Sequence, residues 1–220
     1  MRTIGADILG ASEINVEASH PFVQRLVHKH RNQVWDHSRF QLSNSKISFN
    51  STRKPGGTLI LAQGDVVGRV KEKGSDSLGQ WAWMKLVGRN QRIITLISAY
   101  QVCARPTNKT GTTAYHQQES LLRQKGAKQA KPRKFFYRDL NEFVRLCKTR
   151  QESLILVGDF NEPMSERSSM ARIASTQGLV NIFFQRNCHL TATPTYVRGS
   201  TRINYALISP DLAEAVQHCG

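Results

Sequence analysis

The sequence Leu154-Ile155-Leu156-Val157-Gly158-Asp159-Phe160-Asn161 joins a short apolar run to two polar residues that follow it directly. A run of branched apolar residues this short is typical of a strand buried inside a sheet. Gly158 lets the backbone turn closely, and Asp159 and Asn161 project from one face if the extended geometry continues. Their oxygens suit a hard cation or an attacking water. An ordinary strand-to-loop turn uses the same residue types, so the motif alone leaves both interpretations open.

Outward from this motif, strand-length and helix-length apolar patterns predict a single α/β domain over residues 1–220. We expect strands at residues 6–11, 58–61, 66–70, 81–86, 92–99 and 153–157, and a hairpin within 193–209 that turns near Gly199-Ser200. We expect helices at residues 21–31, 117–125, 132–147, 165–177 and 211–216. Residues 63–65 and 88–91 are expected to be hairpin connections between antiparallel strands.

The charge balance points to a polyanionic partner. The chain has 31 Lys and Arg against 16 Asp and Glu, a net charge of +15. Nucleic-acid phosphates are the natural partner of such a surface, although a basic protein without a nucleic-acid role remains an alternative. One basic stretch lies on a Gly- and Pro-containing connector, where we predict substrate-binding residues. They are Arg123, Lys128, Lys131, Arg133 and Lys134. A solvated loop is the alternative interpretation of this stretch.

Cysteine spacing and hydropathy exclude several protein classes. The four cysteines, Cys103, Cys147, Cys188 and Cys219, form no C-x-x-C motif or Cys/His cluster of the kind that binds zinc. We therefore expect reduced thiols in an intracellular protein. No apolar run approaches the roughly 20 residues of a membrane span, so no membrane partner is expected.

Three further polar residues lie at or within predicted strands. Glu13 follows the first strand, Tyr100 ends the strand at 92–99, and Asn204 lies in an apolar strand that begins near Arg202. Mg²⁺ prefers oxygen ligands, and two carboxylates plus a substrate phosphate make a reasonable site for it. Each residue alone also has an ordinary explanation, namely a surface or capping glutamate, a buried tyrosine, and an asparagine with a structural hydrogen bond.

In this order, the motifs resemble the endonuclease/exonuclease/phosphatase superfamily over nearly the whole chain. The most specific parts are residues 156–161, Thr195-Tyr196 and residues 202–205; Pro55-Gly56-Gly57-Thr58, Ser98-Ala99-Tyr100 and residues 133–143 are most similar to endonuclease domains of non-LTR retrotransposons. The resemblance implies a two-sheet, deoxyribonuclease-like β-sandwich flanked by helices. It implies that Glu13 binds Mg²⁺, or Mn²⁺, and that Tyr100 contacts the substrate phosphate. It further implies that Asp159 activates the attacking water while Asn161 holds the scissile phosphate.

The chain also departs from the family pattern. The resemblance implies an aspartate at position 204, where it orients the catalytic histidine, but this chain has Asn204. The closing Ser-Asp-His motif is not found after Ser209-Pro210, and His218 is not a convincing replacement. The family's first strand and asparagine ligand are also expected before Glu13. We therefore expect a partial domain that lacks the first and last strands and has impaired activity.

The leading functional hypothesis is a metal-dependent endonuclease that nicks DNA, with no small-molecule cofactor, acting in the nucleus if active. A reverse transcriptase domain in a parent element is the expected partner. One alternative is a phosphatase of inositol phosphates or other small phosphoesters, since a scaffold alone does not fix function. Another is a catalytically inactive remnant that binds nucleic acid.

Overall fold

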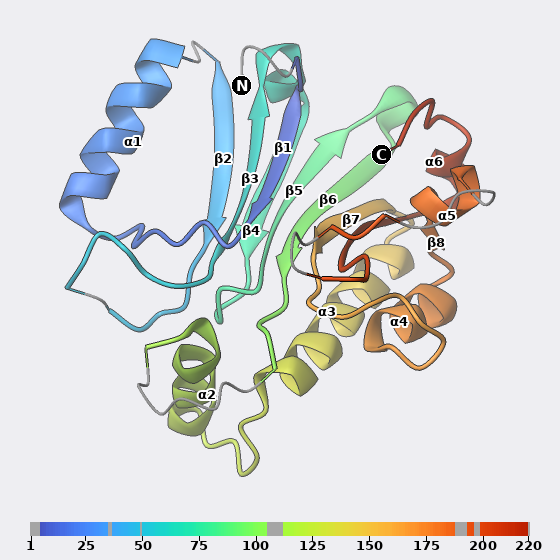
Figure 1. Cartoon of the computed structure of the whole chain (residues 1–220). Coiled ribbons are helices and arrows are strands. Elements are labelled where there is room, and N and C mark those ends of the chain that lie inside the picture. Colours follow the sequence, from blue (N-terminus) through green and yellow to red (C-terminus); the bar gives the residue numbers. More distant parts are fainter. Residues whose placement is uncertain are drawn as a thin grey trace.

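Two facing β-sheets with helices on their outer sides form the computed structural model, which describes residues 5–34, 37–48, 50–104, 112–187, 193–195 and 199–219 (Figure 1). The smaller sheet has the order β1-β3-β2, from β1 (Ile8–Ser12), β2 (Ser38–Ser43) and β3 (Thr58–Gln63). The larger has the order β4-β5-β6-β7-β9-β8, from β4 (Val70–Ser75), β5 (Trp81–Val87), β6 (Ile93–Tyr100), β7 (Ser153–Asp159), β8 (Val180–Asn181) and β9 (Asn204–Ile208). The predicted fold class, a two-sheet sandwich flanked by helices, is confirmed.

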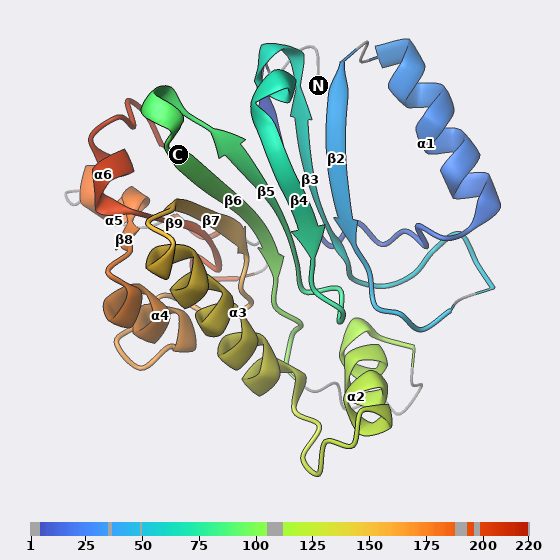
Figure 2. The same ribbon diagram turned by 180° about the vertical axis from the view of Figure 1, so that it is seen from behind.

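Helices surround this sandwich, with α2 beyond one end of the sheets (Figure 1). They are α1 (Pro21–Val34), α2 (Ala114–Gln124), α3 (Pro132–Thr149), α4 (Ser169–Gln177), α5 (Ile182–Arg186) and α6 (Pro210–Ala213). Figure 2 shows α3 and α4 against the larger sheet and α1 beyond β2 at the opposite side. Because α2 and α3 connect β6 to β7, these two strands run parallel, whereas the other strand pairs of both sheets are antiparallel.

Strand β5 shows how sequence alternation builds the two hydrophobic cores. Trp81 and Trp83 face α3, where both rings contact Phe143. Met84, the next residue along the strand, faces the other way and packs with Ile60 of the smaller sheet. Successive side chains of a strand point to opposite faces, so one strand contributes to the core between the sheets and to the core under the helices.

The prediction of a strand at 66–70 is wrong. Residues Gly64–Arg69 form a short 3-10 helix, and the strand begins only at Val70. Gly64 has a φ of 67°, a conformation that ends β3 and that glycine adopts readily. Residues 63–65 are consequently not a hairpin connection, because the segment carries the chain from one sheet to the other. Val66 and Val67 pack against the core from this helical turn.

Other predictions agree with the structure except at element ends. The helix predicted at 165–177 begins at Ser169, because Ser168 is its N-cap and accepts a hydrogen bond from the backbone N–H of Ala171. The last predicted helix is limited to Pro210–Ala213. The hairpin predicted at 193–209 is an exception: strand β9 forms but pairs with β7 and β8, residues 193–195 and 199–203 are not strand, and residues 196–198 lie outside the described residues. Within the described ranges, the helices are too short or too polar to span a membrane.

Candidate active site

Glu13 and Tyr100 meet across the two sheets. Glu13 directly follows β1 with a φ of 52°, a left-handed conformation rare for a non-glycine residue, and Tyr100 is the last residue of β6. The Tyr100 hydroxyl donates a 2.7 Å hydrogen bond to Glu13 Oε1. Burial, and then this bonded carboxylate, raise the pKa of Tyr100 far above its ordinary value, so the phenol keeps its proton.

Asp159 and Asn161 lie close together, but not through the strand geometry that the sequence predicted. Strand β7 ends at Asp159, and Asn161 has a φ of 47°, so the extended alternation does not continue. The backbone N–H of Asn161 instead donates to Asp159 Oδ1 over 3.0 Å. Burial raises the pKa of Asp159, the charge of Glu13 adds to that increase, and the Asn161 N–H opposes it.

The side chain of Asn161 is held at both ends. Its Nδ2 donates to the backbone oxygen of Gln101 over 2.7 Å, and its Oδ1 accepts from Cys103 Sγ at 3.2 Å. An amide nitrogen carries two hydrogens, so one N–H of Asn161 remains for another acceptor. The side chain is thus oriented and still able to donate to a phosphate oxygen.

Strand register places three candidate residues in one row. Tyr100 pairs with Asp159 across the parallel β6–β7 ladder, and Asp159 pairs with Asn204 across the antiparallel β7–β9 ladder. Residues directly opposite each other in a sheet point to the same face. Next to this row, a Cβ on Gly158 would lie 2.0 Å from the backbone oxygen of Ala99, so only glycine permits the close approach of β6 and β7.

Ser12 connects the two halves of the site, and it was not among the candidate residues of the sequence analysis. Its hydroxyl donates to the backbone oxygen of Ala99 over 2.9 Å and accepts from the backbone N–H of Asp159 over 3.4 Å. These contacts fix the spacing between Glu13 in one half and Tyr100 and Asp159 in the other. A polar residue in an apolar strand, next to a candidate glutamate, was the available sequence signal.

A cavity of about 590 Å³ opens at this row, and Glu13, Asp159 and Asn204 line it together with Ser12 and Arg202. Arg202 donates to the backbone oxygen of Asn204 and packs on Phe183. In the described part of the chain, no histidine lines this cavity. His218, at the C-terminal end of the described residues, is exposed.

The donor set of the cavity fits a divalent cation only in part. Glu13 and Asp159 are close enough for one charge to raise the pKa of the other group, and neither forms an ion pair with another described residue. Uncompensated neighbouring carboxylates favour a cation between them. The described residues contain no group of three or more His, Cys, Asp or Glu that could hold a metal. An ion here would therefore depend on oxygen ligands from water or substrate.

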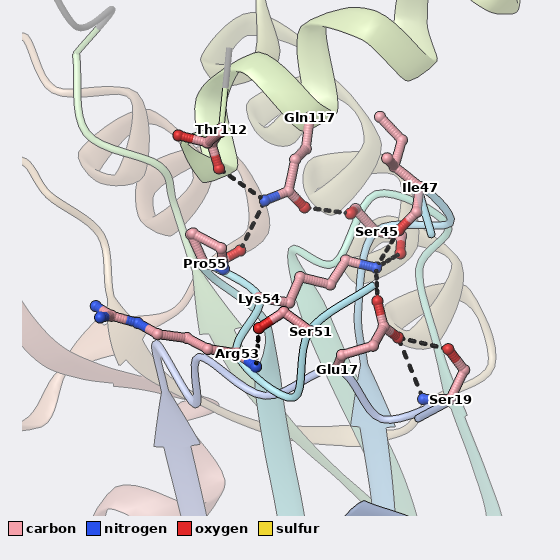
Figure 3. Close-up of polar contacts among 10 residues, drawn as sticks. All are labelled: Glu17, Ser19, Ser45, Ile47, Ser51, Arg53, Lys54, Pro55, Thr112 and Gln117. Atoms are coloured by element: carbon pink, nitrogen blue, oxygen red, sulfur yellow. Dashed lines mark hydrogen bonds and ion pairs between the residues drawn. The ribbon is translucent and has the colours of Figure 1, made fainter. Parts of the chain in front are cut away.

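The segment that leads into the Gly56-Gly57 turn is anchored by the buried cation of Lys54 (Figure 3). Lys54 Nζ donates to the backbone oxygens of Ser45 and Ile47, each at 2.5 Å, and lies 3.0 Å from Glu17 Oε2. Burial alone would raise the pKa of Glu17, but hydrogen bonds from Ser19 and Lys54 lower this pKa below its ordinary value.

Gln117 fastens the same segment to α2. Its Nε2 donates to the backbone oxygen of Pro55 over 3.3 Å, and its Oε1 accepts from Ser45 Oγ over 2.6 Å (Figure 3). A Cβ on Gly56 would lie 2.8 Å from Ala114 Cβ and 3.5 Å from Tyr100 Cε1. The glycine turn therefore packs closely against the tyrosine of the site.

Arg133 is part of the site's framework. Its Nη1 donates to the backbone oxygens of Val102, over 2.9 Å, and Asn161, over 3.3 Å, while its Nη2 pairs with Glu162. The guanidinium thus links the segments that follow β6 and β7. The other predicted substrate-binding residues, Arg123, Lys128, Lys131 and Lys134, lie with Arg133 around a second cavity of about 530 Å³.

Comparison with known proteins places the fold. A family model described as the endonuclease/exonuclease/phosphatase family matches residues 1–220. No curated protein matches the chain. Among solved structures, an AP endonuclease from Leishmania major is 16% identical, with a TM-score of 0.65, and the match covers 97% of this chain and 73% of that one.

Two further solved structures are similar. The catalytic domain of Xenopus laevis APE2 is 13% identical with a TM-score of 0.63, covering 97% of this chain and 77% of that one. A 3′-5′ exonuclease from Neisseria meningitidis is 17% identical with a TM-score of 0.58, and the match covers 95% of this chain and 78% of that one. At these identities the likeness shows a shared fold.

Proposed function

The chain belongs to the endonuclease/exonuclease/phosphatase family, and we propose that it hydrolyses phosphodiester bonds of DNA with a divalent metal ion. The observation that carries the proposal is the row of Tyr100, Asp159 and Asn204 in register, with Glu13 bonded to Tyr100 from the other sheet. The family scaffold alone would not distinguish its activities, so the proposal rests on these side chains.

Glu13 and Asp159, which line the cavity, and Asn161, which follows β7 next to it, divide the proposed chemistry among them. Glu13, with Asp159 beside it, would hold Mg²⁺ or Mn²⁺, which supplies charge neutralisation on phosphate oxygens. Asp159, which lines the cavity, would accept a proton from the attacking water as the water oxygen bonds to phosphorus, and the departing ester oxygen would take up a proton from solvent. Asn161 donates its remaining N–H to a non-bridging phosphate oxygen.

We further propose that turnover is slow, because Asn204 presents a neutral amide where the family resemblance implies an aspartate. The physical reason is electrostatic, since the neutral amide adds no negative charge to the carboxylates of Glu13 and Asp159 that would hold the cation. The turn at residues 55–58 and the segment 133–143 support the retroelement type of DNA nicking within this family. A reverse transcriptase domain in a parent element stays a prediction.

A plasmid-nicking assay tests the proposal. We expect purified protein to convert supercoiled DNA to open circles in Mg²⁺ or Mn²⁺ but not in EDTA. Asp159→Asn should abolish nicking, Asn204→Asp should increase it, and the exposed Asp65→Asn, outside the cavity, is the matched control. Nicking that survives Asp159→Asn would contradict the assignment, and rapid nicking unchanged by Asn204→Asp would contradict slow turnover.

The two alternatives predict different products in the same samples. A phosphatase of small phosphoesters would release inorganic phosphate from inositol phosphates without cutting the plasmid. A nucleic-acid-binding remnant would bind DNA in a salt-dependent manner without any hydrolysis. The net charge of +15 favours a polymeric substrate over a small one.

A further inference from the structure

The second cavity lies between α2 and α3 and is strongly basic. Its lining includes the exposed side chains of Lys128, Lys131 and Lys134, and also Arg123 and Arg133. Glu119 is the one acidic residue among the described residues that line it. The cavity is therefore a local concentration of positive charge on a chain that is already basic.

The lysines of this cavity are available to a ligand, whereas its arginines are engaged. Arg123 pairs with Glu119 over 3.2 Å, and Arg133 binds backbone oxygens and Glu162. The side chains of Lys128, Lys131 and Lys134 form no hydrogen bond or ion pair with other described residues. Like charges repel when gathered without counter-charges, so an anion would relieve this repulsion.

Two contacts connect the basic cavity with the proposed active site. Arg133 lines the cavity and donates to the backbone oxygen of Asn161 over 3.3 Å. Tyr115 also lines the cavity and packs in one buried cluster with Tyr100 and Val102. A polymer whose reacting phosphate lies at Asp159 would thus pass close to the lysines.

We propose that the lysines of this cavity bind backbone phosphates of the substrate strand, flanking the phosphate that is cleaved, so that the substrate is a polynucleotide. This inference rests on the proposed function for the identity of the substrate. Phosphate contacts of this kind fix the position of a nucleic acid without reading its sequence. The lysines therefore confer affinity for nucleic acid of any sequence.

Metal-free DNA binding tests the inference. The affinity for a fluorescein-labelled 20-base-pair duplex is measured by anisotropy in EDTA at several salt concentrations. The variant Lys128→Gln/Lys131→Gln/Lys134→Gln should lower the slope of log affinity against log salt by about 3, since each phosphate-bound lysine contributes about 1. The control Lys29→Gln/Lys71→Gln/Arg150→Gln removes the same charge from exposed positions outside both cavities and should change the slope by less than about 1.

Equal slopes for the two triple variants, or no DNA binding by the unsubstituted protein, would overturn the inference. If the triple variant does not fold, Lys128→Gln alone replaces it in the test. This substitution, in the connector between α2 and α3, should lower the slope of log affinity against log salt by about 1. Hydrolysis is scored separately, with plasmid DNA and bis(p-nitrophenyl) phosphate in Mg²⁺ or Mn²⁺. Binding through the lysines without hydrolysis of either substrate would refute the proposed function alone, whereas cleavage with equal slopes would refute the phosphate site alone.

Discussion

The hydroxyl of Tyr100 donates its single proton to Glu13 Oε1 over 2.7 Å, joining the end of β6 to the residue after β1 in the other sheet. A phenol has one hydrogen to donate, so the same hydroxyl cannot also donate to a phosphate oxygen while this bond is in place. In this arrangement Tyr100 positions the carboxylate of Glu13. The substrate-phosphate role implied by the family resemblance would require the bond to break.

We expect Tyr100→Phe to weaken metal binding. Without the hydroxyl, Glu13 loses the group that orients it, and loss of such a partner typically lowers metal affinity by about 10–100-fold. The measurement is nicking activity as a function of Mg²⁺ concentration, with Tyr137→Phe on α3 as the control. An unchanged Mg²⁺ midpoint with a lower maximal rate would show instead that the hydroxyl acts on the substrate.

We expect Ser12→Ala to reduce both stability and turnover. The substitution removes the hydrogen bonds to Ala99 and Asp159 that connect the sheets under the site. Urea unfolding should show a loss of about 2 kcal/mol in the free energy of unfolding, since each of the two bonds has a usual net value of about 1 kcal/mol. The rate at saturating DNA should fall, with little change in KM, because the site is displaced and the DNA-binding surface is not. Ser175→Ala, at an exposed position on α4, is the control. An equal loss of rate in this control would show that Ser12 does not position the site.

Local patterns predicted most of the elements but not β2, β8 or α5, and long-range pairing decided the site. The apolar run 154–157 was sufficient to place β7, and the spacing after Pro132 was sufficient to place α3. Ser12 and Ala99 are 87 residues apart, so no local pattern reveals their contact. The valines at 66 and 67 have strand propensity, but the transfer of the chain between the sheets required a helical turn there.

The role of Arg133 could not be inferred from the sequence either, because its partners also lie far away along the chain. Its position in a basic stretch predicts a substrate contact, whereas its guanidinium reaches the backbone oxygens of Val102 and Asn161. We expect Arg133→Lys to lower the nicking rate and leave the salt dependence of DNA binding unchanged, because lysine keeps the charge without the planar fork. Steady-state nicking and anisotropy on one preparation measure both. Arg138→Lys, exposed on α3, is the control. An unchanged nicking rate would contradict this framework role and favour the substrate-binding role that the sequence predicts for Arg133.

A buried ion pair away from the site should govern stability at acidic pH. Lys85 Nζ lies 2.7 Å from Glu152 Oε1, with both side chains almost fully buried, and Thr95 donates to Glu152 Oε2 over 2.6 Å. Burial alone would raise the pKa of Glu152, but Lys85 and Thr95 hold it below its ordinary value of 4.5. A carboxyl group whose pKa is lower in the folded state stabilises the fold above its unfolded-state pKa. That contribution is lost as the pH falls toward the folded-state pKa.

We therefore expect Glu152→Gln to lower the free energy of unfolding by about 3–5 kcal/mol at pH 7, because Lys85 keeps its buried charge without its main partner. Glu72, 3.5 Å from Lys85 and half exposed, retains part of the compensation and favours the lower end of this range. The difference from the unsubstituted protein should shrink as the pH falls below 4.5, because Glu152 then takes up a proton in the unfolded chain before it does so in the folded protein. Urea unfolding at pH 7, 5 and 4 measures this, with the exposed Glu166→Gln as the control. A difference that stays constant over this pH range would show that the loss comes from packing and not from charge.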